Sequence, residues 1–378
     1  MSIPFPATNP MPSPMPVGTA LLAGCLLLAA CRNEAGPVAL GVAYQPQNLT
    51  LPAVELAIAD LAAARQPGEP GIVHVVDSTL VGDAAETEVQ RAESLVGTAG
   101  VVAVLGHSSS RGALAAAPVY DSAGIPQLTA IATSRRLQLA GPYTFALAPN
   151  DSVEGAFIGD FVAGHLGARR AALFCENDEY GRGLCSGVQA ELARRDVQVV
   201  DRVPFSSASD YATLLEATAL RIDPDVVIVA GRQMAVAAYA VAAAKHMPGV
   251  PVVAGDAALV LPDLADAAGA AIANIYVTSL WQPDAGNTAS RRFIAAFQAK
   301  TGRPPGPFDA LTYDAMMLLG RAIREAGRDP DEITEWLRDL GDTHPAYQGV
   351  TGSIEFGPER QSRLVMTRIM DGTPVAVP

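Results

Sequence analysis

Hydroxyl side chains follow two consecutive apolar runs of the sequence, at the positions where loops between strands and helices are expected. The first run ends at Leu105 and leads into Ser108-Ser109-Ser110, and the second ends at Thr129 and leads into Ala132-Thr133-Ser134. Because a helix N-terminus has free N–H groups and a partial positive charge, a carboxylate can bind there without lysine or arginine. The alternative is that these hydroxyls only cap their own helices, which is worth about 1 kcal/mol each.

Common catalytic spacings are missing from the sequence. The serine loop does not fit the G-x-S-x-G pattern of a nucleophile elbow. The glycines at 181, 183 and 187 do not have the spacing of a dinucleotide fingerprint. The 5 histidines lack metal-ligand spacing and no C-x-x-C accompanies them. We therefore expect no catalytic residue, no metal and no cofactor.

The composition describes an acidic protein large enough for two domains. Its 378 residues include 26 basic and 39 acidic side chains, a net charge of -13, and 49% of the residues are hydrophobic. A chain of this length exceeds what one hydrophobic core usually organises. Because a negative protein repels a phosphate backbone and an anionic bilayer, we expect no nucleic-acid partner and membrane contact only through an anchor.

Residues 1–30 are typical of a signal peptide of the lipoprotein type. They carry no charged side chain and end in an apolar run that is too short to cross a bilayer, which takes about 20 residues. Leu28-Ala29-Ala30-Cys31 resembles a bacterial lipobox, so Cys31 is the predicted lipidation site, with Cys25 as the alternative. Residues 31–37 would be a lipidated tether, and the protein would lie on the periplasmic or extracytoplasmic face of a membrane.

Short β-branched runs alternate with amphipathic segments beyond residue 37. The expected strands are 38–43, 72–76, 101–105, 127–129, 171–174, 197–203, 226–229 and 250–253, and the expected helices are 51–64, 84–96, 113–123, 153–166, 184–194, 211–220 and 235–245. This alternation predicts an α/β fold with parallel sheets covered on both faces. Ligands bind beyond the carboxyl ends of the strands in such sheets.

Six segments share their order and spacing with one known family. They are 104–110, 115–126, 129–133, Asn177-Asp178-Glu179-Tyr180-Gly181-Arg182-Gly183-Leu184, Thr312-Tyr313-Asp314-Ala315 and Gly352-Ser353-Ile354-Glu355-Phe356. In these segments the chain resembles the type I periplasmic solute-binding proteins, in particular the leucine/isoleucine/valine-binding branch. The resemblance implies two Rossmann-like lobes with parallel sheets, joined by a three-stranded hinge, with the ligand enclosed between them. Lobe 1 would comprise 38–148 plus 280–360, and lobe 2 would comprise 149–279 plus 361–378.

The resemblance also implies which residues bind the ligand. On lobe 1, an α-carboxylate would be held by Ser109 and Ser110 and by the backbone near Ile131, Ala132 and Thr133. On lobe 2, Tyr180 would pack against the ligand or bond to it through its hydroxyl, and Asp256 would pair with an ammonium group. A zwitterion fits this set, because a buried ammonium needs a negative partner and a buried carboxylate needs donors.

Two positions depart from the family pattern and leave the ligand open. Arg232 stands where the family often has an aromatic residue. It would either bind a second carboxylate or another polar group of the ligand, or pair with Asp256 or Asp225 and exclude an amino acid. The loop that begins at Tyr44 is shorter than usual, and Tyr44 would have to replace the aromatic cap over the ligand. A polar or acidic ligand therefore rivals a branched-chain one.

Cys175 and Cys185 could form a disulfide, since thiols of an exported chain can oxidise. Two buried free thiols are the alternative.

Together these features predict a monomeric extracytoplasmic solute-binding lipoprotein. It would capture an amino acid or a similar small carboxylate and deliver it to ABC permease subunits in the membrane. A ligand-sensing receptor or regulator of the same fold is the first alternative. An α/β enzyme is the second, disfavoured by the missing catalytic spacings.

Overall fold

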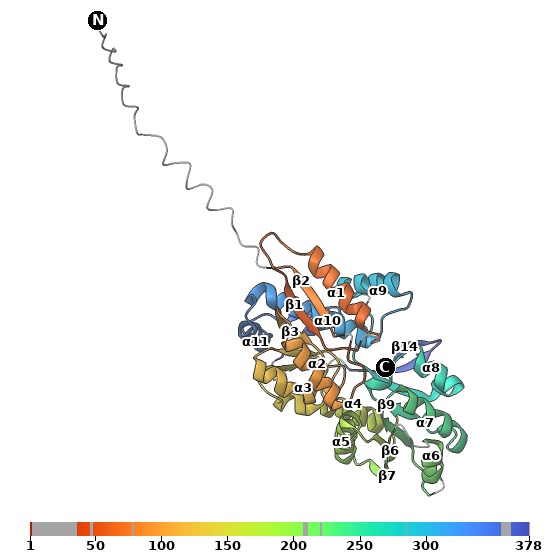
Figure 1. The fold of residues 1–378 in the computed structure, drawn as a ribbon. Coiled ribbons are helices and arrows are strands. Elements are labelled where there is room, and N and C mark those ends of the chain that lie inside the picture. The colour runs from red at the N-terminus through yellow and green to blue at the C-terminus, as the bar shows by residue number, and fades with distance from the viewer. Residues whose placement is uncertain are drawn as a thin grey trace. The chain divides into compact units, whose positions relative to one another are not determined.

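Two mostly parallel sheets organise the chain in a computed structural model (Figure 1). The structure describes residues 1, 36–45, 48–77, 79–206, 211–219, 221–284, 286–356 and 364–377, and residues Pro37–Pro378 form one compact unit. The predicted signal segment with Cys25 and Cys31 lies outside the described residues, as does most of the predicted tether. None of the described helices is long and apolar enough to cross a membrane.

Sheet A is parallel throughout and has the strand order β2-β1-β3-β4-β5. Its strands are β1 (Val38–Val42), β2 (Ile72–Val76), β3 (Val101–Leu105), β4 (Gln127–Thr129) and β5 (Thr144–Ala146).

Sheet B has the order β14-β13-β10-β9-β8-β6-β7, parallel except where β13 pairs with β10 and with β14. Its strands are β6 (Arg170–Glu176), β7 (Gln198–Phe205), β8 (Val226–Ala230), β9 (Val252–Ala254), β10 (Ile275–Ser279), β13 (Val365–Met370) and β14 (Thr373–Ala376). A separate short hairpin joins β11 (Tyr347–Gly349) and β12 (Gly352–Ile354).

Helices connect most of the parallel strands. The α-helices are α1 (Leu51–Ala63), α2 (Ala85–Val96), α3 (Ser110–Ala123), α4 (Asp151–Gly164), α5 (Glu179–Arg194), α6 (Tyr211–Ala219), α7 (Gln233–His246), α8 (Asp263–Ala268), α9 (Thr288–Thr301), α10 (Pro307–Ala326) and α11 (Pro330–Arg338). The 3-10 helices are η1 (Arg135–Leu139), η2 (Asp256–Ala258) and η3 (Gly269–Asn274).

Sheet A is covered on both faces, because successive side chains of a strand point to opposite sides. Leu40 and Val42 of β1 pack into one core with α1 and α10, whereas Ala39 packs into another with Leu95 of α2 and Tyr120 of α3. The central strand β1 is therefore apolar at each position, as the continuous run in the sequence predicts.

Sheet B follows the same plan. Phe174 of β6 lies in a core with α7 and α8, and its neighbour Leu173 lies in a core with α4 and α5. Helices α4 and α5 pack closely against each other (Figure 1). An added Cβ at Gly155 of α4 would lie 2.5 Å from the backbone of Gly187 in α5. Glycines at this crossing thus let the two helices approach.

The chain passes between the two sheets three times: after β5, after β10 and before β13. The segment after β10 returns to sheet A, since α10 packs on α1. All strands of sheet A lie within 38–148, and all strands of sheet B lie within 149–279 or 361–378. The α/β fold class with parallel sheets is confirmed, and the exact lobe boundaries stay a prediction.

Candidate functional site

The two hydroxyl loops meet on sheet A because β3 and β4 are adjacent parallel strands. Ser110 is the first residue of α3, and its Oγ accepts hydrogen bonds from the backbone N–H groups of Thr133 and Ser134, both at 3.2 Å. The amide of Ala132 donates to Thr129 Oγ1. These three amides therefore have hydroxyl acceptors within the protein, whereas the sequence predicted exposed backbone donors in this loop. The Ser110 oxygen occupies the point at which two of them converge, which is where an anionic oxygen would also be stabilised.

Ser109 has a different task from Ser110. It is the N-cap of α3, and its Oγ accepts from the amide of Gly112 at 3.1 Å. The capping alternative thus holds for Ser109, whereas Ser110 links the two loops. Ile131 is half-buried in the second loop.

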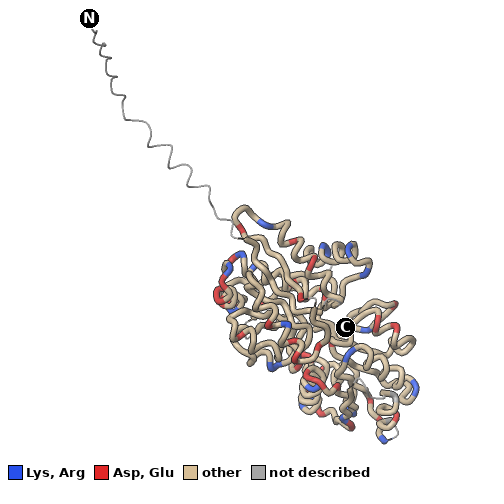
Figure 2. Tube along the Cα trace, viewed as in Figure 1, with Lys and Arg blue, Asp and Glu red and all other residues tan. Residues whose placement is uncertain are grey.

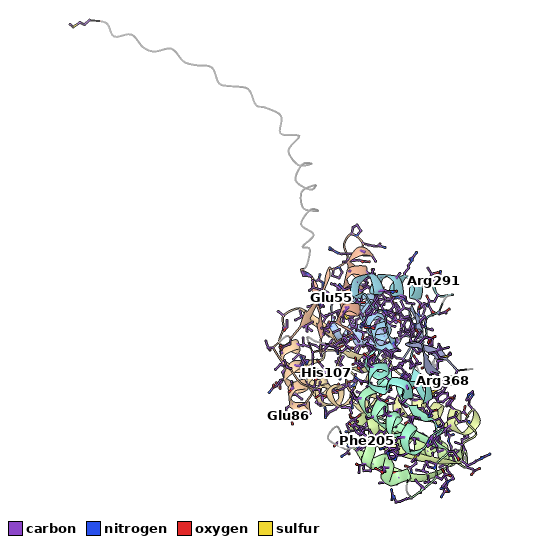
Figure 3. The ribbon with its side chains drawn as sticks, turned by 90° about the vertical axis from the view of Figure 1, so that its right-hand side faces the viewer. Glu55, Glu86, His107, Phe205, Arg291 and Arg368 are labelled. Carbon is purple, nitrogen blue, oxygen red and sulfur yellow. A yellow bond between two sulfur atoms is a disulfide. The ribbon has the colours of Figure 1, made fainter. Side chains whose placement is uncertain are left out.

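The buried His107 directly precedes the serine loop, and its hydrogen bonds fix the start of that loop. His107 is labelled in Figure 3. Its Nδ1 lies 2.5 Å from Glu88 Oε2, its Nε2 lies 3.0 Å from the Tyr120 hydroxyl, and its carbonyl accepts from Thr129. Burial lowers the pKa of His107, more than the adjacent Glu88 carboxylate raises it. A neutral imidazole can donate to Glu88 and accept from Tyr120, so His107 is fixed at both ring nitrogens.

Tyr180 and Asp256 come together on sheet B. The Tyr180 hydroxyl near the start of α5 donates to Asp256 Oδ1 in η2 at 3.1 Å, and both residues are buried. The N-cap Asp178 starts α5 at Glu179 by accepting from the amide of Gly181. Asp256 follows the carboxyl end of β9, where ligand contacts are expected in a parallel sheet.

Two further buried acids of α4 lie beside this pair. Glu154 Oε1 accepts from the Asp256 amide at 2.7 Å and from the Thr278 hydroxyl. Burial, and after it the charge of Asp256, raises the pKa of Glu154 well above its ordinary value. Burial also raises the pKa of Asp151 to about 8, opposed by a hydrogen bond from Thr133 and reinforced by the charge of Asp256. Local negative charge is thus costly unless a cation or a proton neutralises it.

Glu179 and Asp151 link this acidic group to the loops of sheet A. Glu179 Oε1 accepts from the Ser134 hydroxyl at 2.9 Å, and Oε2 pairs with Arg136 at 3.1 Å. The amide of Asp151 donates to the carbonyl of Thr133 at 2.8 Å. A groove of about 650 Å³ borders this junction, with Ser134, Asp151 and Glu179 among its lining residues. Ser110, Tyr180 and Asp256 are not among them.

Arg232 pairs with neither of the acids that the sequence suggested. Its guanidinium binds Glu176 and Asp178, at 2.9 and 2.8 Å, at the carboxyl end of β6. Asp225 instead accepts from the amides of Arg169 and Arg170. With two carboxylates already bound, Arg232 is neutralised, which weakens the expectation of a second ligand carboxylate at this position.

Tyr44 is fully buried in the core that β1 shares with α1 and α10. Its role as an aromatic cap over a ligand stays a prediction.

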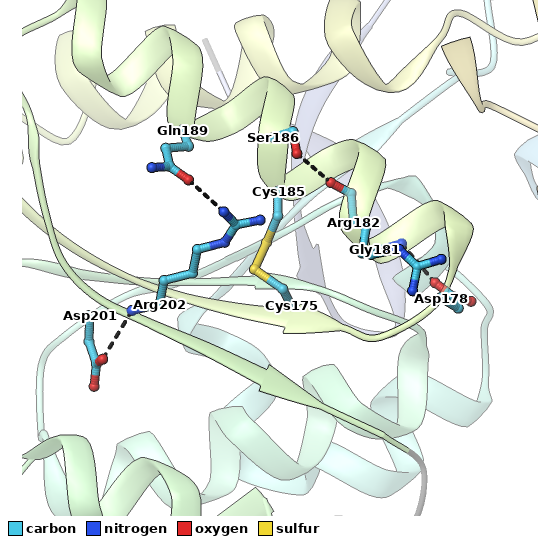
Figure 4. Close-up of a disulfide and its surroundings, with 9 residues drawn as sticks. All are labelled: Cys175, Asp178, Gly181, Arg182, Cys185, Ser186, Gln189, Asp201 and Arg202. Atoms are coloured by element: carbon cyan, nitrogen blue, oxygen red, sulfur yellow. Dashed lines mark hydrogen bonds between the residues drawn. A yellow bond between two sulfur atoms is a disulfide. The ribbon is translucent and has the colours of Figure 1, made fainter. Parts of the chain in front are cut away.

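Cys175 at the end of β6 and Cys185 on α5 are joined by a disulfide, with their Cα atoms 6.0 Å apart (Figure 4). The bridge ties the strand that leads into Glu176 and Asp178 to the helix that carries Tyr180. It therefore restrains the sheet B part of the site.

The sequence reasoning missed Asp151, Glu154, Glu176 and Glu179. Asn150 caps α4 through bonds to the amides of Ser152 and Val153, so the helix starts two residues before the predicted Val153. In the sequence, Asp151 and Glu154 at the start of a helix indicate only a favourable interaction with the helix dipole. Their burial beside Asp256, which the sequence does not show, distinguishes them from other acids at helix starts. Acidic and basic positions are otherwise interspersed along the described chain (Figure 2).

Two α/β sheets joined by three chain crossings, with buried polar groups at the strand ends, are the arrangement expected of a two-lobed solute-binding protein. The family model described as periplasmic binding protein matches residues 16–368. An amino acid binding protein of Pseudomonas aeruginosa is 27% identical over 281 residues, which cover 72% of this chain and 73% of the relative.

Solved structures agree with this class. A leucine binding protein from Thermotoga maritima has a TM-score of 0.82 at 22% identity, covering 90% of this chain and 98% of that one. A branched-chain amino acid transporter substrate binding protein from Streptococcus pneumoniae, solved with isoleucine, has a TM-score of 0.79 at 21% identity, with coverages of 90% and 98%. The chain belongs to the periplasmic binding protein family, whose members bind solutes and are not enzymes.

Proposed function

We propose that this protein is the lipid-anchored, extracytoplasmic solute-binding component of an ABC transporter, and that it captures an amino acid or a similar small carboxylate. The anchor would be Cys31, the partner the permease subunits of the transporter, and the working form a monomer. The likeness to a branched-chain amino acid transporter substrate binding protein supports a transport role, and the Pseudomonas aeruginosa relative supports an amino acid as the ligand.

The position of Ser110 is the main observation that supports the proposed class of ligand. Its hydroxyl lies at the meeting point of the Thr133 and Ser134 amides, next to a junction that Glu179 makes with sheet B. A ligand carboxylate bound by Ser110 and these amides needs no cation, because N–H dipoles and a hydroxyl satisfy its charge. On sheet B, Asp256 with Tyr180 would receive the ammonium group.

A ligand can contact Ser110 beside sheet A and Asp256 beside sheet B at the same time only when these two residues are brought close together. Binding would therefore favour a closed state over an open one, and the permease would respond to that shift. Leucine, isoleucine and polar amino acids all remain inside the proposed class, because the carboxylate and ammonium contacts are common to them.

A thermal-shift screen of the mature chain tests the proposal. The probes are the standard L-amino acids, dicarboxylates, amides and small aromatic acids. A ligand at a hundred times its Kd adds about 2.7 kcal/mol of stability. If no probe raises the melting temperature, the proposed ligand class is wrong.

A matched pair of variants then tests the assigned site. Ser110→Ala removes the hydroxyl at the carboxylate position and should weaken binding by about 1 kcal/mol or more, roughly fivefold. Ser122→Ala changes an exposed serine of the same helix and should bind normally. Equal affinities of the two variants would contradict the assignment of Ser110.

A further inference from the structure

Two buried carboxyl groups face each other without a cation. Glu154 of α4 is fully buried and Asp256 of η2 is nearly so. Glu154 Oε1 accepts from the Asp256 amide and the Thr278 hydroxyl, but its Oε2 has no hydrogen-bond partner among the described residues. In the described part of the chain, no lysine, arginine or histidine forms an ion pair with either carboxyl group.

Among the described residues, the groups that surround the pair are acidic or neutral. The buried carboxyl of Asp151 on the same helix interacts electrostatically with the pair, and the neutral Tyr180 hydroxyl from α5 donates to Asp256. Thr278 faces it from β10 as a neutral donor. Arg232, the cation on the neighbouring strand end, is committed to Glu176 and Asp178.

Two ionised carboxylates cannot share such a site, because each is desolvated and repels the other. One of two conditions removes the repulsion: a proton held between them, or a cation bound to them. The chain itself offers no cation at this place, but the proposed ligand has an ammonium group.

We infer that Glu154 and Asp256 hold one proton between them in the ligand-free protein and release it to solvent when the ammonium group of an amino acid binds. Glu154 is then the group that makes the affinity for amino acids depend on pH. The inference rests on the proposed function, since it needs an ammonium-bearing ligand at Asp256. In the exchange no covalent bond changes except that of the proton: a carboxylic acid and a carboxylate become two carboxylates, and the proton passes to solvent. The bound ammonium replaces the positive charge of that proton, so the carboxylates together with the ammonium carry the same net charge of about -1 as the protonated pair did before binding.

The directions in which the pKa values of Glu154 and Asp256 are shifted agree with this inference. Burial raises the pKa of both carboxyl groups, and the charge of Asp256 raises that of Glu154 further. Both shifts favour the pair with one bound proton over the pair with none.

The test is a calorimetric titration of the full mature chain at pH 7 in Pipes and in Tris, which take up a released proton with different heats. The probes are the standard L-amino acids, each paired with its deaminated acid, such as L-leucine with 4-methylpentanoate. The wild type should release about one proton per bound amino acid and close to none per bound deaminated acid.

Glu154→Gln should lower the release to near zero per bound amino acid, whereas Glu93→Gln, an exposed acid of α2, should keep it near one. If Glu154→Gln does not fold, Thr278→Ala replaces it. Loss of that hydroxyl raises the proton affinity of Glu154, so the release should persist to higher pH than in the wild type.

Two results overturn the inference: wild-type heats that do not depend on the buffer, or equal release from the wild type and Glu154→Gln. If no amino acid binds, the result contradicts the proposed function and, with it, this inference. Binding without proton release leaves the proposed function standing and removes the inference alone.

Discussion

The raised pKa of Asp151 makes a quantitative prediction about stability against pH. Burial raises the pKa of this carboxyl from 3.8 to about 8, and its side chain is only 1% exposed. The folded chain therefore binds the proton more tightly than the unfolded chain does. The stability that this proton provides is present at low pH and is lost as the pH rises toward the folded-state pKa.

The magnitude follows from the two pKa values. Between pH 5 and pH 8, a shift from 3.8 to about 8 removes about 3–4 kcal/mol of unfolding free energy. For a unit of about 340 residues, each kcal/mol corresponds to about 1.4 °C, so the melting temperature should fall by about 5 °C from this group alone. Asp151→Asn removes the titration and should remove this part of the decline.

The assay is thermal unfolding of the ligand-free chain at pH 5, 6, 7 and 8. Asp160→Asn is the control, since Asp160 lies exposed on the same helix and pairs with Arg195 at the surface. It should keep the wild-type slope. The reasoning is refuted if Asp151→Asn and Asp160→Asn decline in parallel between pH 5 and pH 8.

The remaining predictions concern the disulfide, the ammonium site and a helix crossing. Replacing Cys175 and Cys185 together by alanine should lower the unfolding free energy by up to about 3 kcal/mol, because the bridge closes a loop across 10 positions; a denaturation curve unchanged from the wild type would contradict this. Asp256→Asn should weaken amino-acid binding by about 2–5 kcal/mol in a titration, and an affinity within about threefold of the wild type would remove Asp256 from the site. Gly155→Ala should destabilise the chain by about 1–3 kcal/mol, since its Cβ would lie 2.5 Å from the backbone of α5. Gly164→Ala, whose Cβ meets nothing within 4 Å, should be neutral or stabilising, and a similar loss in both variants would contradict the close-contact argument.

Local pattern predicted the strands well where the whole run is buried. The run 101–105 coincides with the fully buried β3, since apolar β-branched residues between helices have few other stable arrangements. The run 72–76 also coincides with β2, although β2 is only partly buried. The start of α5 was predicted at Leu184 but lies at Glu179. Gly181 and Gly183 look like loop residues in the sequence. In the structure they are needed in the helix, because a Cβ at Gly183 would lie 2.2 Å from Asp151 Oδ2.

In the candidate site, too, some contacts could be predicted from the sequence and others could not. The adjacency of the Ser110 and Thr133 loops follows from the order of neighbouring strands, so it could be expected from the sequence. The contacts of Arg232 could not, since the sequence suggested Asp256 or Asp225 as partners and only the packing of β6 beside β8 selects Glu176 and Asp178.

By itself, the sequence determined the α/β class, the family resemblance and the hydroxyl loops, because these depend on residue type and short-range spacing. Tertiary structure alone decided that Glu154 and Asp256, 102 positions apart, meet in the interior, and that Thr278 joins them from 124 positions away. A lone acid at the start of a helix is ordinary in a sequence. Burial against a second acid, which only folding produces, turns it into a group with a raised pKa and gives it a role in the proposed site.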